Sequence, residues 1–265
     1  MNITIITPIY GQEKTLHLHV KSIEDLNYDK SKIELIFAND KSPDNVLKVA
    51  EKIKTTSKLN IRIVDYKVNR GTAICAIETA KKAKHPNLLI TNGKVQFDPE
   101  LLNEIKKSNH PVINCSLRFK MNNIYAKLFF LVRRGLYREK FNLPKEDQWQ
   151  DQENFYDFPT GATTFFVKKG LYLETAEQNI KSRHHNDDTS HFWKMAGLHK
   201  ILRSHKAIIY YSNRDGLLNN LSHIYQRGPK FVSFYFKPGK KYFPLILISL
   251  LSLIAITLLA QDFWR

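Results

Sequence analysis

The feature that most constrains this chain is the alternation of short apolar runs with amphipathic segments over its first 110 residues. Four apolar runs have the length and β-branched content of strands: 3–9, 33–38, 61–64 and 88–91. Each is followed by a segment with helical spacing: 13–26, 46–55, 72–83 and 99–107. Short strands that alternate with helices are typical of a parallel sheet covered by helices. We therefore predict an α/β domain with a mostly parallel, helix-covered sheet.

Polar loops follow the predicted strands. They contain Tyr10 and Gly11, Asn39 and Asp40, Asn69 to Gly71, and Asn92 to Lys94. Ligands of open parallel sheets bind beyond the carboxyl ends of the strands, so we expect these loops to gather at one edge. No Gly-x-Gly-x-x-Gly follows the first strand and no Gly-Lys-Ser/Thr loop occurs. The sequence therefore disfavours dinucleotide-binding and P-loop proteins.

The net charge of the chain limits the classes of partner that it is expected to bind, and its cysteines show no metal-binding pattern. The chain has 41 Lys and Arg against 25 Asp and Glu, a formal net charge of +16. Such an excess favours nucleic acid, an anionic membrane surface, or nucleotide-diphosphate and lipid-phosphate ligands. Cys75 and Cys115 have no metal-ligand spacing, and we expect both to be reduced and buried.

The segment 242–260 contains no charged residue. As a helix it would be roughly 28 Å long, close to the hydrocarbon thickness of a bilayer. We predict a transmembrane helix at 242–261, with a buried core helix as the alternative. Lysines in the preceding basic segment 216–241 predict, by the positive-inside bias, a single-pass cell-membrane protein with its main domain in the cytoplasm. The N-terminal run 1–8 is expected to be a strand rather than a signal peptide.

The segment 122–138 mixes large apolar residues with lysine and arginine. Two interpretations remain open. The segment is either an amphipathic helix that lies in a membrane interface, or a core-packing helix with a solvated basic face.

Six short motifs occur in order along the chain. Residues 6–10 end a strand with Pro-x-Tyr, 39–44 read Asn-Asp-Lys-Ser-Pro-Asp, 69–71 read Asn-Arg-Gly, 159–162 read Pro-Thr-Gly-Ala, 187–188 are paired aspartates, and 226–227 are Gln-Arg. This pattern resembles family 2 glycosyltransferases, inverting enzymes of the GT-A fold. It is most similar to bacterial members anchored by C-terminal spans.

The resemblance implies a nucleotide-diphosphate sugar as donor. It implies that 1–110 form the nucleotide-sugar-binding half and 111–215 the acceptor-binding half of a GT-A domain. In that comparison, Asp40 meets the base or ribose, Gly71 allows close backbone approach, and Arg227 contacts the diphosphate. The full set of implied donor residues is Pro8, Tyr10, Asp40, Gly71, Asn92, Lys94 and Arg227.

The acceptor side implied by the resemblance contains Gly161, Ala162 and Gln226. Asp188 is the implied general base, with Asp187 beside it. An inverting enzyme needs one carboxylate to remove the proton of the acceptor hydroxyl as that hydroxyl attacks the anomeric carbon. The two aspartates alone are also compatible with residues that simply open a helix.

The family's metal-binding Asp-x-Asp is replaced by Asn92-Gly93-Lys94. Mg²⁺ and Mn²⁺ need oxygen ligands, whereas Lys94 offers none and repels a cation. We therefore predict no metal site of the family's kind and expect Lys94, with Arg227, to neutralise the diphosphate. His184, His185 and His191 are expected to be solvated loop histidines rather than metal ligands.

Three functional hypotheses follow. The first is a metal-independent glycosyltransferase that acts on a glycan or lipid-linked acceptor. The second is a catalytically silent relative that serves as a binding or scaffold protein. The third is a nucleic-acid or anionic-lipid binder, which accounts for the charge but not for the motif series and lacks a recognised nucleic-acid module. We expect no nucleic-acid partner.

Overall fold

The computed structural model describes residues 1–120, 123–137, 145–159, 162–177 and 188–212, together with 225, 236, 243–244, 247–249 and 251–252. The chain divides into two compact units, Met1–Asp215 and Gly216–Arg265. Almost every described residue belongs to the first unit, which contains one sheet and the helices around it.

The first half of the sheet is parallel. Its strands are β1 (Ile3–Ile9), β2 (Ile33–Asn39), β3 (Asn60–Asp65) and β4 (Asn87–Ile90). They lie in the order β3-β2-β1-β4, and each neighbouring pair runs parallel. All residues of β1 and β2 are buried, as expected for central strands covered on both faces. The four predicted strands are confirmed to within one residue at each end.

The second half of the sheet is mixed. It continues from β4 through β8 (Phe165–Lys168), β6 (Val112–Lys120), β9 (Ile201–Ser212) and β5 (Val95–Phe97), and β7 (Gln148–Gln150) also pairs with β9. The β6–β9 pair is parallel, whereas the pairs of β8 with β4 and β6, and of β9 with β5 and β7, are antiparallel. The prediction of a mostly parallel sheet is therefore right for the first four strands and wrong for the whole sheet.

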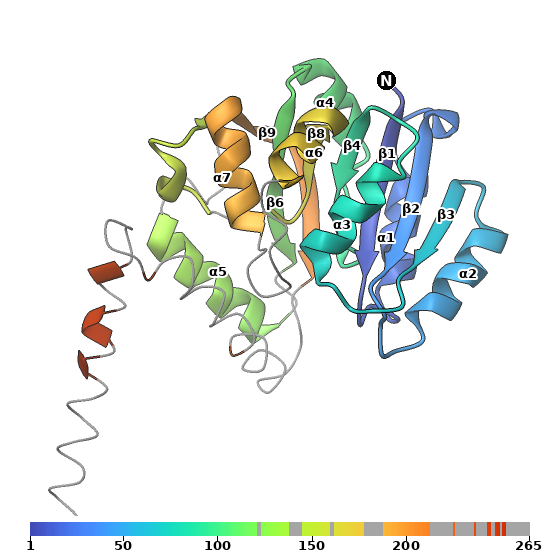
Figure 1. Cartoon of the computed structure of the whole chain (residues 1–265), viewed down its shortest axis with the longest axis horizontal. Helices are drawn as coiled ribbons and strands as arrows, with labels where there is room; N and C mark the ends of the chain where they lie inside the picture. Colours follow the sequence, from blue (N-terminus) through green and yellow to red (C-terminus); the bar gives the residue numbers. More distant parts are fainter. Residues whose placement is uncertain are drawn as a thin grey trace, which may run out of the picture. The chain divides into compact units, whose positions relative to one another are not determined.

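Helices cover both faces of the sheet (Figure 1). One apolar core lies under α1 (Leu16–Glu24), α2 (Val46–Thr56) and α4 (Leu101–Ser108). The other lies under α3 (Thr72–Lys81), α6 (Lys169–Glu177) and α7 (Asp188–Leu198). The remaining helical segments are α5 (Ile124–Tyr137) and the 3-10 turns η1 (Lys30–Lys32) and η3 (Phe155–Asp157). The helices predicted in the first 110 residues are confirmed to within three residues at each end.

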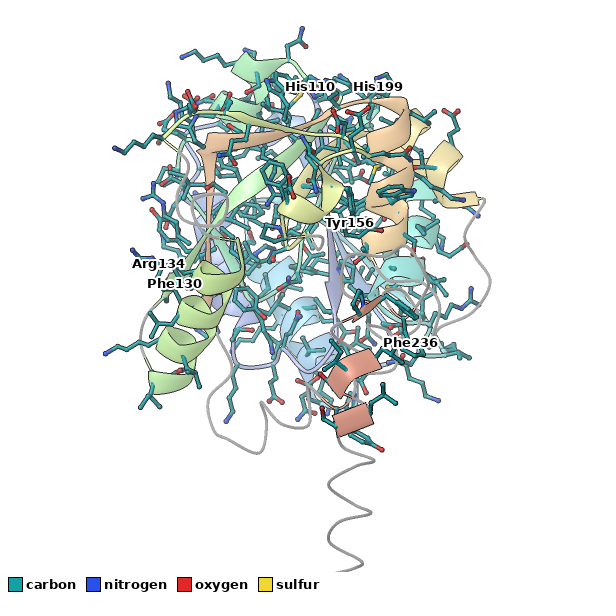
Figure 2. The ribbon with its side chains drawn as sticks, turned by 90° about the vertical axis from the view of Figure 1, so that its left-hand side faces the viewer. His110, Phe130, Arg134, Tyr156, His199 and Phe236 are labelled. Carbon is teal, nitrogen blue, oxygen red and sulfur yellow. The ribbon has the colours of Figure 1, made fainter. Side chains whose placement is uncertain are left out.

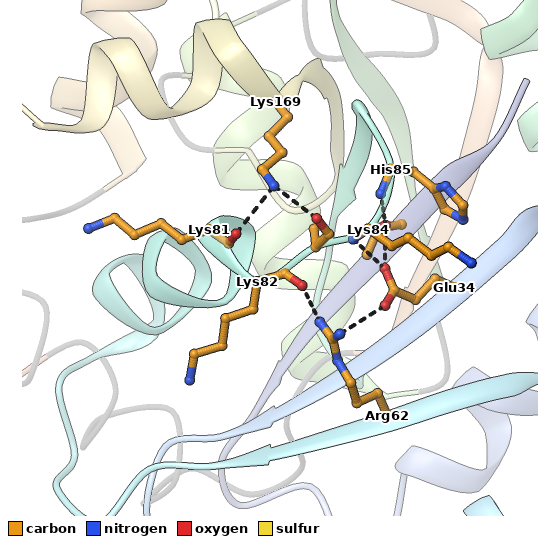
Figure 3. Close-up of polar contacts among 9 residues, drawn as sticks. Glu34, Arg62, Lys81, Lys82, Lys84, His85 and Lys169 are labelled. Atoms are coloured by element: carbon orange, nitrogen blue, oxygen red, sulfur yellow. Dashed lines mark hydrogen bonds and ion pairs between the residues drawn. The ribbon is translucent and has the colours of Figure 1, made fainter.

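Glu34 joins three strands at the amino edge of the parallel half (Figure 3). Its side chain is buried and accepts hydrogen bonds from Thr4 Oγ1 at 2.7 Å and from the backbone N–H of Lys84 at 2.8 Å. The Arg62 guanidinium forms an ion pair with the same carboxylate at 3.3 Å and also donates to the carbonyl of Lys82. This cluster ties β1, β2 and β3 to the turn that follows α3.

The predicted C-terminal span and the segment before it fall almost entirely outside the described residues. Among the described residues, no helix is both long and apolar enough to cross a bilayer. The transmembrane helix at 242–261 and the basic segment 216–241 therefore stay predictions.

Candidate donor and acceptor site

Hydrogen bonds join the loops at the carboxyl edge of the parallel strands. The backbone N–H of Gly11 donates to Ser42 Oγ at 2.8 Å, and that of Glu13 donates to Asp44 Oδ2 at 2.9 Å. These bonds link the loops that follow β1 and β2. The backbone N–H of Gly93 donates to Gln12 Oε1 at 3.1 Å, which links the loops that follow β1 and β4. The structure therefore brings these predicted loops together.

Asp40 fixes the loop that precedes α3. Its side chain is buried, and its two carboxylate oxygens accept the backbone N–H groups of Arg70 at 2.7 Å and of Gly71 at 2.8 Å. Asp40, which is predicted to contact the nucleotide, therefore holds the backbone of the loop at Arg70 and Gly71.

Gly71 has a backbone conformation that favours glycine. Its φ is +86°, in a backbone region that residues other than glycine rarely adopt. It occupies the N-cap position of α3, where a glycine leaves the first N–H groups of the helix open to a ligand. Its hydrogen bond to Asp40 holds this helix start at the carboxyl edge of the sheet.

Tyr10 and Pro8 lie at the end of β1, but in different environments. Pro8 belongs to the strand and is buried, whereas the Tyr10 side chain is 47% exposed. An exposed aromatic ring beside two hydrogen-bonded loops is available to stack on a planar ligand group.

Residues 92–94 form a side-chain turn. Asn92 Oδ1 accepts the backbone N–H of Lys94 at 3.0 Å, and the Asn92 carbonyl accepts that of Val95 at 3.1 Å. A Cβ at Gly93 would meet Gln12 Oε1, so a larger residue here would require the Gln12 side chain to move and would break its hydrogen bond to the turn. The Lys94 side chain is half-buried at this turn.

The residues at this turn do not fit a divalent cation. The Asn92 side-chain oxygen already accepts a hydrogen bond from the turn, and Lys94 brings a positive charge. The nearest downstream carboxylate, Asp98, accepts the Tyr210 hydroxyl at 3.2 Å and the Glu100 N–H at 3.1 Å. Within the described part of the chain, no three His, Cys, Asp or Glu side chains could jointly hold a metal ion.

His19 is hydrogen-bonded to Val95, the residue that directly follows the turn at 92–94. Its Nδ1 lies 2.6 Å from the Val95 carbonyl oxygen, so this nitrogen carries the proton and donates. Its Nε2, 3.1 Å from Thr7 Oγ1, then accepts the hydroxyl proton. Burial lowers the pKa of His19 to about 4, and the imidazole is neutral at physiological pH. The sequence analysis missed this residue, although a histidine between Leu16 and Val20 on an apolar helix face was a visible signal.

The residues predicted to contact the acceptor are described in part. Thr91 Oγ1, at the end of β4, lies 2.8 Å from Thr164 Oγ1, immediately before β8. This contact places the segment containing the half-buried Ala162 beside the donor loops. Gly161 and Gln226 lie outside the described residues.

Helix α7 begins at Asp188, as expected for an aspartate that opens a helix. The side chain of Asp188 lies outside the described residues. So do Asp187, Arg227, His184 and His185. Their predicted roles stay predictions.

His191 is a core residue, and the expectation that it is a solvated loop histidine is wrong. Its Nε2 lies 2.8 Å from Thr175 Oγ1 and 3.1 Å from the Tyr172 carbonyl oxygen, and its ring stacks on Tyr172. Burial lowers the pKa of His191 to about 4. The spacing of α7 turns this residue inward, where α6 supplies its partners.

Both cysteines are free and buried, as expected. Burial raises the pKa of the Cys75 thiol, and the nearby Asp40 carboxylate raises it further. Burial likewise raises the pKa of Cys115. Neither thiol is therefore a nucleophile at neutral pH.

Residues 4–167 match the family model described as glycosyl transferase family 2, which is more than half of the chain. The chain belongs to glycosyltransferase family 2. Its fold is of the GT-A type.

Solved structures share the fold of this family 2 glycosyltransferase. TarS 1-349 of S. aureus, in complex with UDP-GlcNAc, aligns with a TM-score of 0.64 at 19% identity, over 82% of this chain and 60% of the TarS 1-349 chain. The mannosyltransferase PcManGT of Pyrobaculum calidifontis, in complex with GDP-Man and Mn²⁺, aligns with a TM-score of 0.64 at 16% identity, over 90% of this chain and 65% of PcManGT.

An uncharacterized protein of Methanocaldococcus jannaschii is 22% identical over 151 residues, which are 51% of this chain and 64% of that protein. The glycosyltransferase thus spans less than two thirds of the length of each of these three proteins.

Proposed function

We propose that this glycosyltransferase moves a sugar from a nucleotide-diphosphate sugar to a hydroxyl acceptor. The observation that carries the proposal is the bonding of Asp40 to the loop of Gly71, which shapes the carboxyl edge of β2 for a ligand. The complexes of TarS with UDP-GlcNAc and of PcManGT with GDP-Man support this class of donor. Residues 1–110 would hold the donor and 111–215 the acceptor.

The reaction we propose is an inverting displacement. Asp188, at the start of α7, removes the proton of the acceptor hydroxyl, which attacks the anomeric carbon from the face opposite the diphosphate. Asp187 is its neighbour. Lys94 and Arg227 place positive charge where the leaving diphosphate develops negative charge. No step uses a divalent cation, because the turn at 92–94 does not supply its ligands.

We also propose that the acceptor is a glycan or lipid-linked molecule presented at the membrane. The uncharged segment 242–261 would anchor the chain in the cell membrane, with the catalytic domain on the cytoplasmic side.

The exposed face of α5 supports the membrane proposal. Ile124, Leu128 and Leu131 are 73%, 59% and 59% exposed, and their spacing places them on one helix face. Lys127 and Arg134 are exposed beside them, and Arg134 is labelled on this helix in Figure 2. An apolar stripe flanked by cations fits an anionic bilayer surface, so of the two interpretations of 122–138 we favour the interfacial helix.

A sugar-nucleotide binding screen tests the donor class and the need for metal together. We expect binding of a UDP- or GDP-sugar by calorimetry, with the same affinity in EDTA and in Mn²⁺. Transfer or slow hydrolysis should persist in EDTA and disappear in Asp188→Asn. Asp25→Asn, at an exposed position beyond α1, is the matched control and should keep activity. A folded protein that binds no sugar nucleotide contradicts the proposal.

The second candidate is a catalytically silent binding protein. The absence of a divalent-cation ligand set at Asn92 and Lys94 favours it specifically. Donor binding without turnover across a panel of glycan and lipid-linked acceptors would select this candidate over the first.

A further inference from the structure

Three neighbouring strands place polar side chains in one row beside the turn at 92–94. Tyr210 of β9 is paired with Arg118 of β6 on one side and with Gln96 of β5 on the other. Residues paired in register project from the same face of a sheet, so the three side chains are neighbours. Gln96 is two residues beyond Lys94, which places this row at the proposed diphosphate position.

Arg118 is the unusual member of the row. It is half-buried, and its Nε is shielded from solvent without a hydrogen-bond partner among the described residues. Nor does any other hydrogen bond or ion pair involve its guanidinium in that part of the chain. A guanidinium has five N–H donors, and leaving buried donors unsatisfied costs free energy. This arginine is therefore positioned for a partner that the described protein does not provide.

Lys120 adds a second cation to the row. It is two residues beyond Arg118 and thus projects from the same face of β6. Its Nζ donates to Gln96 Oε1 at 2.7 Å, which means that the side chain reaches across β9. Lys120 is paired with Ser212, and the preceding residue of β9, Tyr211, is paired with Val95. The ammonium is thereby held at the same sheet edge as Lys94, with two further N–H donors available.

Among the described residues, the carboxylate of Asp98 is bonded to this row and by itself does not compensate both cations. Asp98 accepts the Tyr210 hydroxyl and the Glu100 N–H. The row therefore carries a local excess of positive charge toward the carboxyl edge.

We propose that Arg118 and Lys120 form an anion subsite that binds a phosphate group next to the turn at 92–94. A planar guanidinium matches phosphate oxygens in a bidentate manner, and an ammonium adds a point charge. The subsite rests on the proposed function and extends it to two residues outside the recognised motifs. The phosphate belongs either to the donor diphosphate or to a phosphate-bearing acceptor.

The test measures Kd by calorimetry for wild type, Arg118→Gln, Lys120→Gln and the double variant. The donor probes are UDP and GDP, with uridine as the phosphate-free control. The acceptor probe is farnesyl phosphate, with farnesol as its control. Lys52→Gln removes the same charge from an exposed position on α2 and serves as the matched variant.

We expect the double variant to bind at least one phosphate probe about tenfold more weakly or worse, because charge-assisted hydrogen bonds are lost. Uridine and farnesol should be unaffected, and Lys52→Gln should resemble wild type. A loss confined to UDP and GDP assigns the subsite to the donor, and a loss confined to farnesyl phosphate assigns it to the acceptor. If Arg118→Gln lowers the thermal unfolding midpoint, Lys120→Gln alone provides the comparison.

Unchanged affinity of the double variant for every phosphate probe overturns the subsite, as does a wild type that binds none of them. Failure of the proposed function gives a different result. A wild type that binds farnesyl phosphate through Arg118 and Lys120 but binds neither UDP nor GDP removes the donor proposal and retains the subsite.

Discussion

Strand β2 has a buried carboxylate at each end, and the two are held differently. Glu34, near its start, is 4% exposed and is bonded to a threonine hydroxyl, a backbone N–H and the Arg62 guanidinium. Asp40, directly after its end, is 3% exposed and accepts the backbone N–H groups of Arg70 and Gly71.

The difference indicates that Glu34 stabilises the sheet, whereas Asp40 shapes the proposed donor site. Glu34 connects elements that are already fixed in the sheet, and a side-chain cation offsets its charge. Asp40 instead orders a loop whose glycine starts α3 at the proposed donor position. Removing the first should weaken only the folding of the domain, whereas removing the second should weaken ligand binding as well as folding.

The largest expected effect is that of Glu34→Ala on stability. The substitution leaves the Lys84 N–H and the buried Thr4 hydroxyl without this acceptor and removes the partner of Arg62. We expect the free energy of unfolding to fall by about 3 kcal/mol in urea titrations. The folded fraction should bind nucleotide as wild type does. Glu51→Ala, exposed on α2, is the control, and a loss no larger than that of the control would contradict the assignment.

Asp40→Asn should have a smaller effect on folding and a distinct effect on binding. The asparagine would replace one carboxylate oxygen by an NH2 group, which cannot accept the backbone N–H that this oxygen now accepts. We expect this to cost about 2 kcal/mol of unfolding free energy. With the loop of Gly71 loosened, Kd for UDP or GDP should rise about tenfold, measured by calorimetry. Unchanged nucleotide affinity in a destabilised Asp40→Asn protein would make Asp40 equivalent to Glu34 and remove the contrast.

The stability of the fold should also depend on pH, because His19 is buried beside the turn at 92–94. The unfolded chain takes up a proton near pH 6.5, whereas the folded state resists until about pH 4. Stability therefore falls as the pH falls through this window, with about 1 kcal/mol from His19 between pH 7 and pH 5.5. Buried His191 adds a similar amount.

Urea titrations at several pH values measure this contribution, and His19→Gln should reduce the dependence of stability on pH. His17→Gln, exposed on the same helix, should leave it unchanged. An equal pH dependence in wild type and His19→Gln would show that the imidazole is not the titrating group.

The smallest expected effect is on thiol reactivity. Cys75 lies close enough to Asp40 to interact with its charge, and both burial and that charge raise the pKa of the thiol. Asp40→Asn should therefore increase the native labelling rate of Cys75 severalfold, as followed by peptide mass spectrometry. Cys115, buried elsewhere, is the internal control. Equal acceleration at both thiols would indicate global opening rather than a change at this loop.

The parallel half could be predicted from sequence because its signals are local. Apolar runs and helical spacing locate β1 to β4 and their helices, and strand direction follows from the short connections. The mixed half depends on pairing between distant segments, such as Val95 with Tyr211, for which no local pattern exists. The single prediction of a mostly parallel sheet failed for that reason.

The candidate site, too, could be predicted only where the sequence signal is local. Asp40 and Gly71 could be singled out by motif, but their mutual hydrogen bond crosses 31 positions of sequence. Arg118 carries no motif and resembles any arginine in a strand. Its significance arises only when β9 brings it beside Gln96 and the turn at 92–94.

The turn at Asn92 has a consequence for protein engineering. Its shape depends on one side-chain oxygen accepting the Lys94 N–H, and an aspartate offers the same oxygen in the same place. Gly93 and its contact with Gln12 stay as they are. Exchanging Asn92 and Lys94 for aspartates would thus install a carboxylate pair on an unchanged main chain. Two side chains would then separate the proposed diphosphate site, with its charge neutralised by Lys94, from one with carboxylate ligands for a metal.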